Sequence, residues 1–422
     1  MAARGVAARG VTDRPFVNPW LWLAVIGAVA VRLLLLPGYV LLGDLDQYAR
    51  WAHHLATDLP FGAAYGQDFS YMPVLVSVFG FLAKLVPAFA TAGDASDAGV
   101  RIILKIPALI GEIAIAAGLY TALRHRPPLA AVAIVAVLLV PATWYLGAWW
   151  GQLDAVYVAL CLWAAILASR DQRWPFAVLL GLAMMTKPQA LFLAVPFAGY
   201  AIGRWGVRRA SLVGLVAVAV AAATWLPFLS HGGLADYLRN LDYYQNGEYP
   251  ILSVRAWNPW WLLQELVGGG AFLRDSTPVL GPLTPRHLGI VMTAIASVAI
   301  FLALLRRATP DRLYLSLAAA TLGAFCLMTS MHERYAYAAL VFLAPLLARR
   351  PVQVAWGILA VAVSLNVVAG APPDQVGPIV PIGGIVGAAG SLAMVVATVI
   401  VFALLLGDRR PGPVSEASVA LA

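Results

Sequence analysis

Stretches of about 15 to 25 apolar residues, the length that a helix needs to cross a bilayer, recur along this chain of 422 residues. A helix also satisfies its own backbone hydrogen bonds in lipid. Apolar residues make up 62% of the sequence and charged residues 11%, against about 25% charged in an ordinary soluble domain. The sequence therefore predicts an all-α, polytopic integral membrane protein in one domain, 1–422, and excludes a soluble enzyme and a disordered chain.

The polar joints between the apolar stretches divide the chain into about twelve predicted transmembrane helices. The first stretch follows three arginines like a signal peptide, but it is long enough to span and no small-residue cleavage site follows. We therefore interpret it as an uncleaved first helix. Cys161 and Cys326 lie inside apolar stretches and are interpreted as packing residues. The predicted spans are 20–42, 103–123, 129–148, 153–169, 174–186, 189–203, 211–228, 288–305, 312–329, 336–348, 352–370 and 382–407.

Positive charge is concentrated at alternate joints, so the net charge of +8 predicts topology and not a nucleic-acid partner. Seventeen of the 28 Lys and Arg residues lie at these joints, with only five of the 20 acidic residues. Because cytoplasmic loops carry the excess of Lys and Arg, we predict that both termini, including a tail at 411–422, are cytoplasmic. The basic residues at these joints are Arg4, Arg9, Arg14, Arg124, Arg126, Arg170, Arg173, Arg204, Arg208, Arg209, Arg306, Arg307, Arg312, Arg349, Arg350, Arg409 and Arg410.

Two predicted outer loops hold most of the remaining polar sequence, at 43–102 and 229–286. Within the first, 71–89 is apolar enough to cross, but a crossing there would place every later arginine group outside. We therefore predict an interfacial helix, supported by Lys84 and by the helix-interrupting Pro73 and Pro87. The short stretches 174–186 and 189–203 are predicted to form either two spans or a broken hairpin around Lys187-Pro188.

Polar motifs far apart in the sequence fall on the same predicted outer face, as expected if they line one pocket. They are Gly43-Asp44-Leu45-Asp46-Gln47-Tyr48 with Trp51, Tyr71-Met72-Pro73, Trp150-Gly151-Gln152-Leu153-Asp154, Lys187-Pro188-Gln189, Arg255, and Met331-His332-Glu333-Arg334-Tyr335.

Asp44 and Asp46 are the first candidates for chemistry. A carboxylate pair at a membrane surface suits a general base, because desolvation can raise the pKa of one carboxyl group and leave the other ionised. The spacing from Asp46 to Arg50 would let the arginine hold one carboxylate and leave the other free. The alternative is a solvated loop. Trp150 is either an interfacial aromatic residue or a ligand contact, whereas the neighbouring amide and carboxylate suit binding of sugar hydroxyls.

Lys187 lies in apolar sequence, where an unpaired ammonium costs about 3 kcal/mol, so it requires an anion. Glu112, Asp154 and a ligand phosphate are the alternatives. Lys105 lies two turns before Glu112 on the same helical face, which also predicts a pair between those two residues.

His332 has no second histidine at helical spacing, so zinc is unsupported. Arg334 and Arg255 suit phosphate, because a guanidinium contacts two phosphate oxygens at once. The sequence contains no nucleotide-binding loop. Such a pocket, open to lipid, suits a substrate with an anionic head, a sugar and a lipid tail.

In their order, these motifs resemble the bacterial polytopic mannosyltransferase-type members of the GT-C glycosyltransferase superfamily, from Gly43 to Tyr335. The first loop and the His-Glu-basic turn are more distantly similar to eukaryotic dolichyl-phosphate-glucose-dependent glucosyltransferases. Met72 stands where the family often has a second proline.

The resemblance implies an enzyme of the plasma membrane that transfers a sugar, with mannose favoured, from a polyprenyl-phosphate donor to a glycan or glycolipid acceptor on the outer face. It implies an acid in the first outer loop as the base of an inverting single displacement, and juxtamembrane helices in that loop. We expect no cofactor and no metal. The predicted roles are catalysis for Asp44 and Asp46, phosphate binding for Lys187, Arg255, His332 and Arg334, and sugar or acceptor binding for Tyr48, Trp51, Tyr71, Trp150, Gln152, Asp154, Gln189 and Glu333.

The alternative class is a flippase or transporter of a lipid-linked sugar, which would share the spans and the basic groups. A transporter needs polar residues near the midplane and often has internal repeats. The sequence has no evident repeat and its polar motifs cluster on one face, which favours the enzyme. A structural subunit of a cell-wall assembly would not require Asp44, Lys187 and His332 together. Glucose, galactose and arabinofuranose remain open as the sugar.

Overall fold

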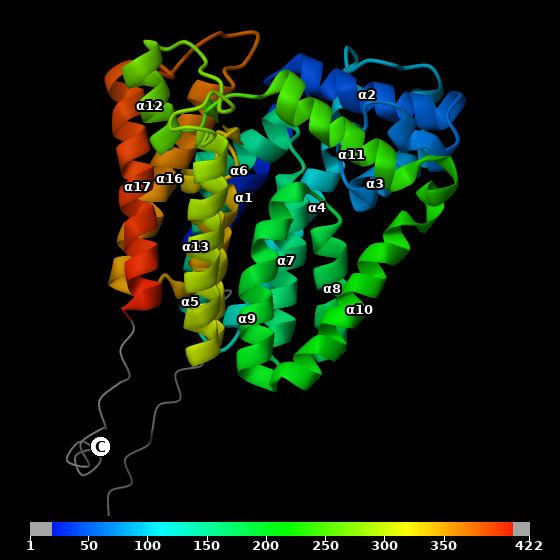
Figure 1. The fold of residues 1–422 in the computed structure, drawn as a ribbon. Coiled ribbons are helices and arrows are strands. Elements are labelled where there is room, and N and C mark those ends of the chain that lie inside the picture. Colours follow the sequence, from blue (N-terminus) through cyan, green and yellow to red (C-terminus); the bar gives the residue numbers. More distant parts are fainter. Residues whose placement is uncertain (1–18, 408–422) are drawn as a thin grey trace, which may run out of the picture.

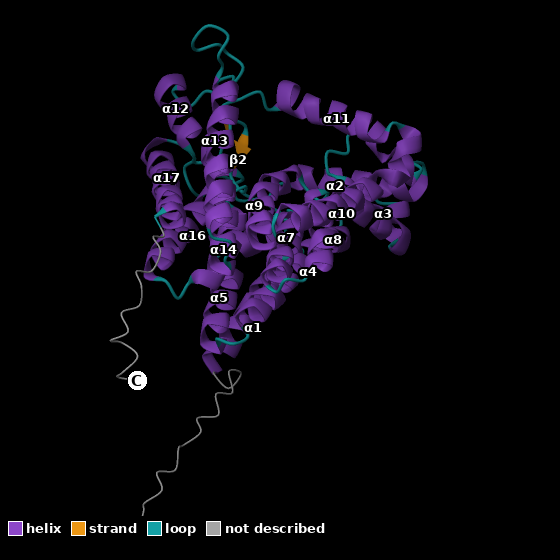
Figure 2. Ribbon diagram, turned by 60° about the horizontal axis from the view of Figure 1, so that its bottom comes forward, coloured by secondary structure: helices purple, strands orange, loops and turns teal. Residues whose placement is uncertain are grey.

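The computed structural model describes residues 19–407. The predicted tail at 411–422 and the arginines before residue 19 and after residue 407 lie outside the described residues. The described chain is almost entirely helical, with only two short strands (Figure 2). The all-α prediction is therefore confirmed.

Each of the twelve predicted spans overlaps one long or broken helix of the bundle. These helices are α1 (Pro19–Leu35), α4 (Ala98–Leu123), α5 (Pro127–Leu139), α7 (Asp154–Ser169), α8 (Arg173–Met184), α9 (Ala194–Trp205), α10 (Val207–Trp225), α13 (Pro285–Arg306), α14 (Pro310–Leu327), α15 (Tyr337–Leu343), α16 (Arg350–Gly370) and α17 (Gly384–Leu406).

Shorter elements connect these helices. They are α2 (Leu42–Thr57), α3 (Pro73–Leu85), α6 (Pro141–Trp144), α11 (Gly233–Tyr243) and α12 (Pro259–Gly268), the 3-10 helices η1 (Phe61–Gly66), η2 (Pro87–Ala90), η4 (Pro188–Leu193), η5 (Leu226–His231) and η7 (Ala344–Leu346), the π-helices η3 (Tyr145–Trp150) and η6 (Tyr244–Glu248), and the parallel strands β1 (Ser253–Val254) and β2 (Met331–His332).

Proline and capping residues explain where many of these helices begin. Proline at the first helical position costs no hydrogen bond, because that N–H has no partner within the helix. Side chains of Asp97, Asn258, Thr284 and Thr309 cap the backbone N–H groups at the starts of α4, α12, α13 and α14. These local signals are readable in the sequence.

Within residues 19–407, five helices are long and apolar enough to cross a membrane, or six if the bent pair Pro127–Leu139 and Pro141–Trp150 counts as one span. The other apolar helices are short or broken, so the number of about twelve crossings stays a prediction. The break predicted near Lys187-Pro188 is present, because α8 ends at Met184 and a 3-10 helix follows. Helix α3 has 13 residues, about 20 Å, and is too short to cross a hydrocarbon core of about 30 Å.

The bundle has two distinct ends (Figure 1). Helices α2, α11 and α12 lie at one end, and the C-terminal ends of α9, α13 and α17 lie at the other. The arginines at the ends of α9 and α13 and at the start of α10 therefore share one end, as the charge pattern predicts. Helix α14 is buried along nearly its whole length and forms the centre of the main apolar core.

A second apolar cluster supports the end that carries α2. It joins α2, η1 and α3 through side chains such as Trp51, Tyr65 and Phe79, and reaches α4 at Leu104 and the start of α7 at Leu153. The main core contains Trp150 of η3. The polar motifs of the sequence meet where these two clusters adjoin.

Candidate active site

The first turn of α2 places Asp44 against the segment that follows η3. Its Oδ2 accepts hydrogen bonds from Nε1 of Trp150 and Nε2 of Gln152, each at 2.9 Å. Gly151 between the two donors has φ +88°, a conformation that glycine adopts without strain, and it lets both side chains turn to the same oxygen. Oδ1 of Asp44 has no hydrogen-bond partner among residues 19–407. Asp44 is thus a half-buried carboxylate held by neutral donors.

A buried ion pair lies next to this carboxylate. Nζ of Lys187, in the break between α8 and η4, lies 3.0 Å from Oδ2 of Asp154 in the first turn of α7. A helix N-terminus favours a carboxylate at that position. The lysine ammonium also lies 4.9 Å from the ring centroid of Tyr71. Of the three anions proposed for Lys187, Asp154 is therefore the one that the structure supplies.

The turn after β2 contributes the next charged groups. Nη1 of Arg334 donates to Oε1 of Glu333 at 2.8 Å, and its Nε lies 3.9 Å from Oδ2 of Asp154. The guanidinium lies 5.0 Å from the ring of Trp150, within cation–π range. Arg334 therefore contacts both the ion pair and one of the residues that hold Asp44.

His332 lies beside Arg334, with its ring between Tyr249 and Tyr335 at 5.1 Å from each centroid. Burial, together with the positive charges of Arg334 and Lys187, lowers the pKa of His332 well below its ordinary value. Burial raises the pKa of Glu333, although Arg334 opposes that shift. His332 is therefore neutral near pH 7 and can act as a hydrogen-bond donor or acceptor.

Arg255 is held at the edge of the site by the pairing of β1 with β2. It forms a bridge to His332, has φ +58°, and donates from Nη1 to the carbonyl of Gly370 at 2.9 Å. Its side chain is exposed, and no carboxylate pairs with it within residues 19–407. Ser330, just before β2, also has a positive φ of 57°. Two strained non-glycine residues thus flank the strand pair that places His332.

Two tyrosines line the same region. The hydroxyls of Tyr48 and Tyr71 hydrogen-bond to each other, and Tyr71 also carries the lysine contact described above. Burial raises the pKa of both hydroxyls. The carboxylate of Asp44 adds to the effect on Tyr48, and that of Asp154 adds to it on both tyrosines. Both tyrosines are neutral, so they offer hydrogen bonds without charge.

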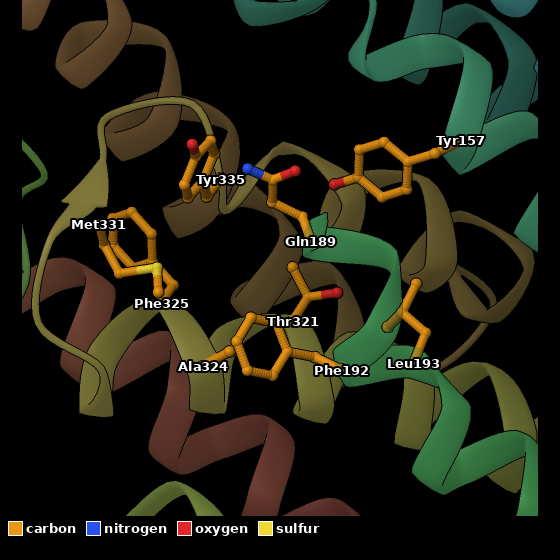
Figure 3. A pocket seen from close by; sticks show the side chains of 9 residues that line it. All are labelled: Tyr157, Gln189, Phe192, Leu193, Thr321, Ala324, Phe325, Met331 and Tyr335. Carbon is orange, nitrogen blue, oxygen red and sulfur yellow. The ribbon is translucent and has the colours of Figure 1, made fainter. Parts of the chain in front are cut away.

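A pocket with apolar walls adjoins the charged cluster (Figure 3). Its polar groups are the amide of Gln189 and the hydroxyls of Tyr157, Thr321 and Tyr335, and its other walls come from η4, α14 and β2. Oε1 of Gln189 is buried and has no hydrogen-bond partner in the described chain. Sequence reasoning missed Tyr157 and Tyr249. Tyr157 follows Asp154 by three residues, so helical spacing could have placed it on the same face.

Two predicted site residues, Asp46 and Trp51, direct their polar atoms away from the charged groups of the site. Oδ1 of Asp46 accepts the backbone N–H of Ala95 at 2.8 Å, because residues two apart on a helix point in nearly opposite directions. The expected pairing of Asp46 with Arg50 is not what holds this carboxylate. Trp51 donates to Asp68 and stacks on Phe69, inside the second apolar cluster.

The expected pair of Glu112 with Lys105 is wrong. Glu112 pairs with Arg32 of α1, with Nε and Oε2 2.5 Å apart. Nζ of Lys105 donates instead to the carbonyls of Leu36 and Gly38 beyond the end of α1. The lysine thus satisfies carbonyl groups that a helix end leaves without partners.

Residues 19–407 contain no group of three or more His, Cys, Asp or Glu side chains placed to hold a metal ion. The two cysteines are buried and unpaired with each other, in agreement with packing roles. Metal-independent chemistry stays a prediction.

The helical bundle, with its polar site at the end that carries α2, is the architecture of a polytopic membrane protein. The sequence model of glycosyltransferase family 87 matches residues 69–330, more than half of the chain. The chain belongs to that family.

A solved structure has the same fold. It is the crystal structure of ArnT from Cupriavidus metallidurans in the apo state, with a TM-score of 0.50 and 16% sequence identity. The similarity covers 92% of this chain and 77% of that one. No curated protein sequence matches this chain. The family match therefore confirms the prediction of a glycosyltransferase, and the solved structure confirms the predicted fold, whereas the donor, the sugar and the acceptor stay predictions.

Proposed function

We propose that this glycosyltransferase moves a hexose, with mannose the first choice, from a polyprenyl-phosphate sugar to a lipid-linked or cell-envelope glycan. The transfer takes place on the extracytoplasmic face of the plasma membrane. The arginine-rich joints support this orientation, because those at the ends of α9 and α13 lie opposite the end that carries α2 (Figure 1).

The observation that carries the proposal is the environment of Asp44. Nε1 of Trp150 and Nε2 of Gln152 orient Oδ2 without neutralising its charge. The nearest cations are engaged elsewhere, since Lys187 pairs with Asp154 and Arg334 pairs with Glu333. An oriented and accessible carboxylate is what a general base requires.

The donor phosphate is proposed to bind at the basic residues next to Asp44. Lys187 and Arg334 converge on Asp154, and Arg255 adds a positive charge at the edge that no described carboxylate neutralises. His332, neutral between them, adds a hydrogen bond. Such preorganised donors act on the negative charge that grows as the phosphate leaves.

The proposed reaction is a single displacement with inversion. An acceptor hydroxyl gives its proton to Asp44 as its oxygen bonds to the anomeric carbon of the sugar. The bond from that carbon to the phosphate oxygen breaks, and polyprenyl phosphate leaves with the electron pair. The hydroxyls of Tyr48 and Tyr71, Gln152, the amide of Gln189 and Glu333 are placed to orient sugar or acceptor hydroxyls.

The test is transfer from radiolabelled polyprenyl-phosphate-mannose to a membrane glycolipid extract by purified protein. Replacing Asp44 with Asn keeps the size and an oxygen acceptor but removes the base, so we expect turnover to fall about 10²- to 10⁴-fold while donor binding persists. The matched control is Asp58→Asn, at the exposed end of the same helix, which should behave like wild type.

Asp46→Asn separates the two acids of the motif. The amide oxygen can still accept the N–H of Ala95, so we expect most activity to remain. Full activity in Asp44→Asn would exclude Asp44 as the base. Donor binding by wild type without transfer of mannose, glucose, galactose or arabinofuranose to any acceptor fraction would overturn the proposed function.

A further inference from the structure

A second buried ion pair lies behind the site and takes no part in the proposed chemistry. Arg32 in α1 and Glu112 in α4 are 9% and 3% exposed, and the guanidinium also donates to the carbonyls of Ala28 and Leu138. Ion pairs buried in apolar surroundings rarely stabilise a fold more than apolar side chains of the same volume would. Charged side chains inside membrane-spanning helices commonly have a functional role.

The second oxygen of this carboxylate points at the backbone beneath the site. Oε1 of Glu112 is buried without a hydrogen-bond partner in the described chain. It lies against Gly147, where an added methyl group would be 2.0 Å from it. The preceding Gly111 also packs closely on Ala155, next to Asp154, with 2.7 Å from an added methyl to the carbonyl carbon. One turn of α4 therefore supports both segments that carry the site.

Gly147 lies in the middle of the π-helix η3, Tyr145–Trp150. A π-turn holds one more residue than an α-turn, is rare, and frequently lies at a functional site. If η3 relaxed to an α-helix, the following residues would rotate by about 100° per residue displaced. Trp150 and Gln152 would then no longer converge on Asp44.

We propose that Glu112, oriented by Arg32, is a positioning residue that maintains the π-turn of η3, and through it aims the N–H groups of Trp150 and Gln152 at Asp44. The glycine at 147 leaves the room that the carboxylate occupies. The turnover test of this role rests on the proposed function. The conformation of η3 can be measured without substrate, so that test does not.

Two double variants test the role. Arg32→Gln with Glu112→Gln keeps a planar polar group against Gly147 and leaves no unpaired charge, so η3 and turnover should stay close to wild type. Arg32→Met with Glu112→Ala removes the group. We expect turnover to fall about 10²-fold with little change in the KM for donor, since small misplacements of catalytic groups have effects of that size.

Hydrogen exchange measured by mass spectrometry gives the second readout. In the Met/Ala variant the amides of residues 145–152 should exchange faster than in wild type, with no matching change in α14. Ser316→Ala, which removes a buried polar group from α14, is the control and should leave residues 145–152 unchanged.

Unchanged turnover and exchange in the Met/Ala variant would overturn the proposal. So would equal losses in both double variants, because charge and not the contact with Gly147 would then be the cause. If the Met/Ala variant fails to fold, Gly147→Ala replaces it, since its methyl group must displace Glu112 or η3 and should give the same faster exchange. Faster exchange in a protein that transfers none of the sugars would support the positioning role while the proposed function fails.

Discussion

Lys187 and Asp154 form a buried ion pair at the centre of the site, with Nζ 3.0 Å from Oδ2 and each side chain only 2% exposed. The pair joins the break after α8 to the first turn of α7, so it fixes two helices as well as two charges. Its structural and chemical contributions can be separated by mutation.

Asp154→Ala should destabilise the protein by about 3–5 kcal/mol, because it leaves Lys187 buried without an anion. Asp154→Leu combined with Lys187→Met should recover most of the melting temperature but not the sugar transfer. Asp171→Asn at the exposed pair with Arg204 should change the melting temperature little. A double variant as unstable as the single one would show that the pair itself stabilises the fold.

Arg334→Lys should lower turnover about 10²-fold, the effect of losing one preorganised donor. The guanidinium contacts Glu333 through Nη1 and covers the ring of Trp150, and an ammonium cannot do both. Transfer assays with Arg239→Lys, at an exposed pair in α11, provide the comparison. Equal turnover in Arg334→Lys and wild type would mean that only the positive charge at this position matters.

The lowered pKa of His332 predicts a dependence of stability on pH. The unfolded chain binds the proton more readily than the folded one, so this contribution is present above about pH 6.5 and is lost as pH falls toward the folded pKa. Melting temperatures between pH 5 and pH 7.5 should therefore fall less steeply on acidification in His332→Asn than in wild type.

The groups around this histidine are Arg334, Lys187, Glu333, Tyr249 and Tyr335. Glu333 affects stability in the opposite direction. Its pKa is raised in the folded protein, so its contribution to the free energy of unfolding is lost as pH rises above about 4.5. Glu333 is present in both wild type and His332→Asn, so the difference between their melting curves reports the contribution of His332. Parallel curves for the two proteins would contradict the prediction.

Much of this architecture could be predicted because hydropathy, proline and charge act locally along the chain. The arginine joints predicted which helix ends lie together, and the ordered motifs predicted the family and most of the cluster around Asp44. The same reasoning treated Asp44 and Asp46 as one pair. Had 43–57 been read as a helix, the two-residue spacing would have separated them.

The partners of the buried charges could not be predicted in this way. Glu112 pairs with Arg32, 80 positions away, and not with Lys105 on its own helix face, because the choice depends on how α1 packs on α4. The π-turn of η3 also has no sequence signal apart from its glycine. Spacing along one helix does not report contacts between helices.

Asp275, in the predicted outer loop 229–286, is a buried carboxylate with several hydrogen-bond donors. It is fully buried and accepts hydrogen bonds from Nε and Nη2 of Arg286 and from the hydroxyls of Thr329 and Ser330. Ser330 directly precedes β2, so this carboxylate ties the large loop to the strand that places His332.

Asp275→Asn should therefore lower both the melting temperature and turnover. An amide has one oxygen in place of two and presents N–H groups to the guanidinium of Arg286, so the loss should be about 3 kcal/mol, as for other broken buried pairs. Asp236→Asn in α11, whose partner Arg239 is exposed, is the control for transfer and for melting temperature. Asp275 contacts none of the residues proposed to bind substrate. Any change in the KM for donor should therefore come from a displacement of β2, which carries His332, and not from the lost charge. Arg286→Lys retains the charge but not both hydrogen bonds to Asp275, so it should lower turnover as well. Normal turnover in Arg286→Lys together with a loss in Asp275→Asn would show that only the charge matters, and would contradict a structural link from the loop to β2.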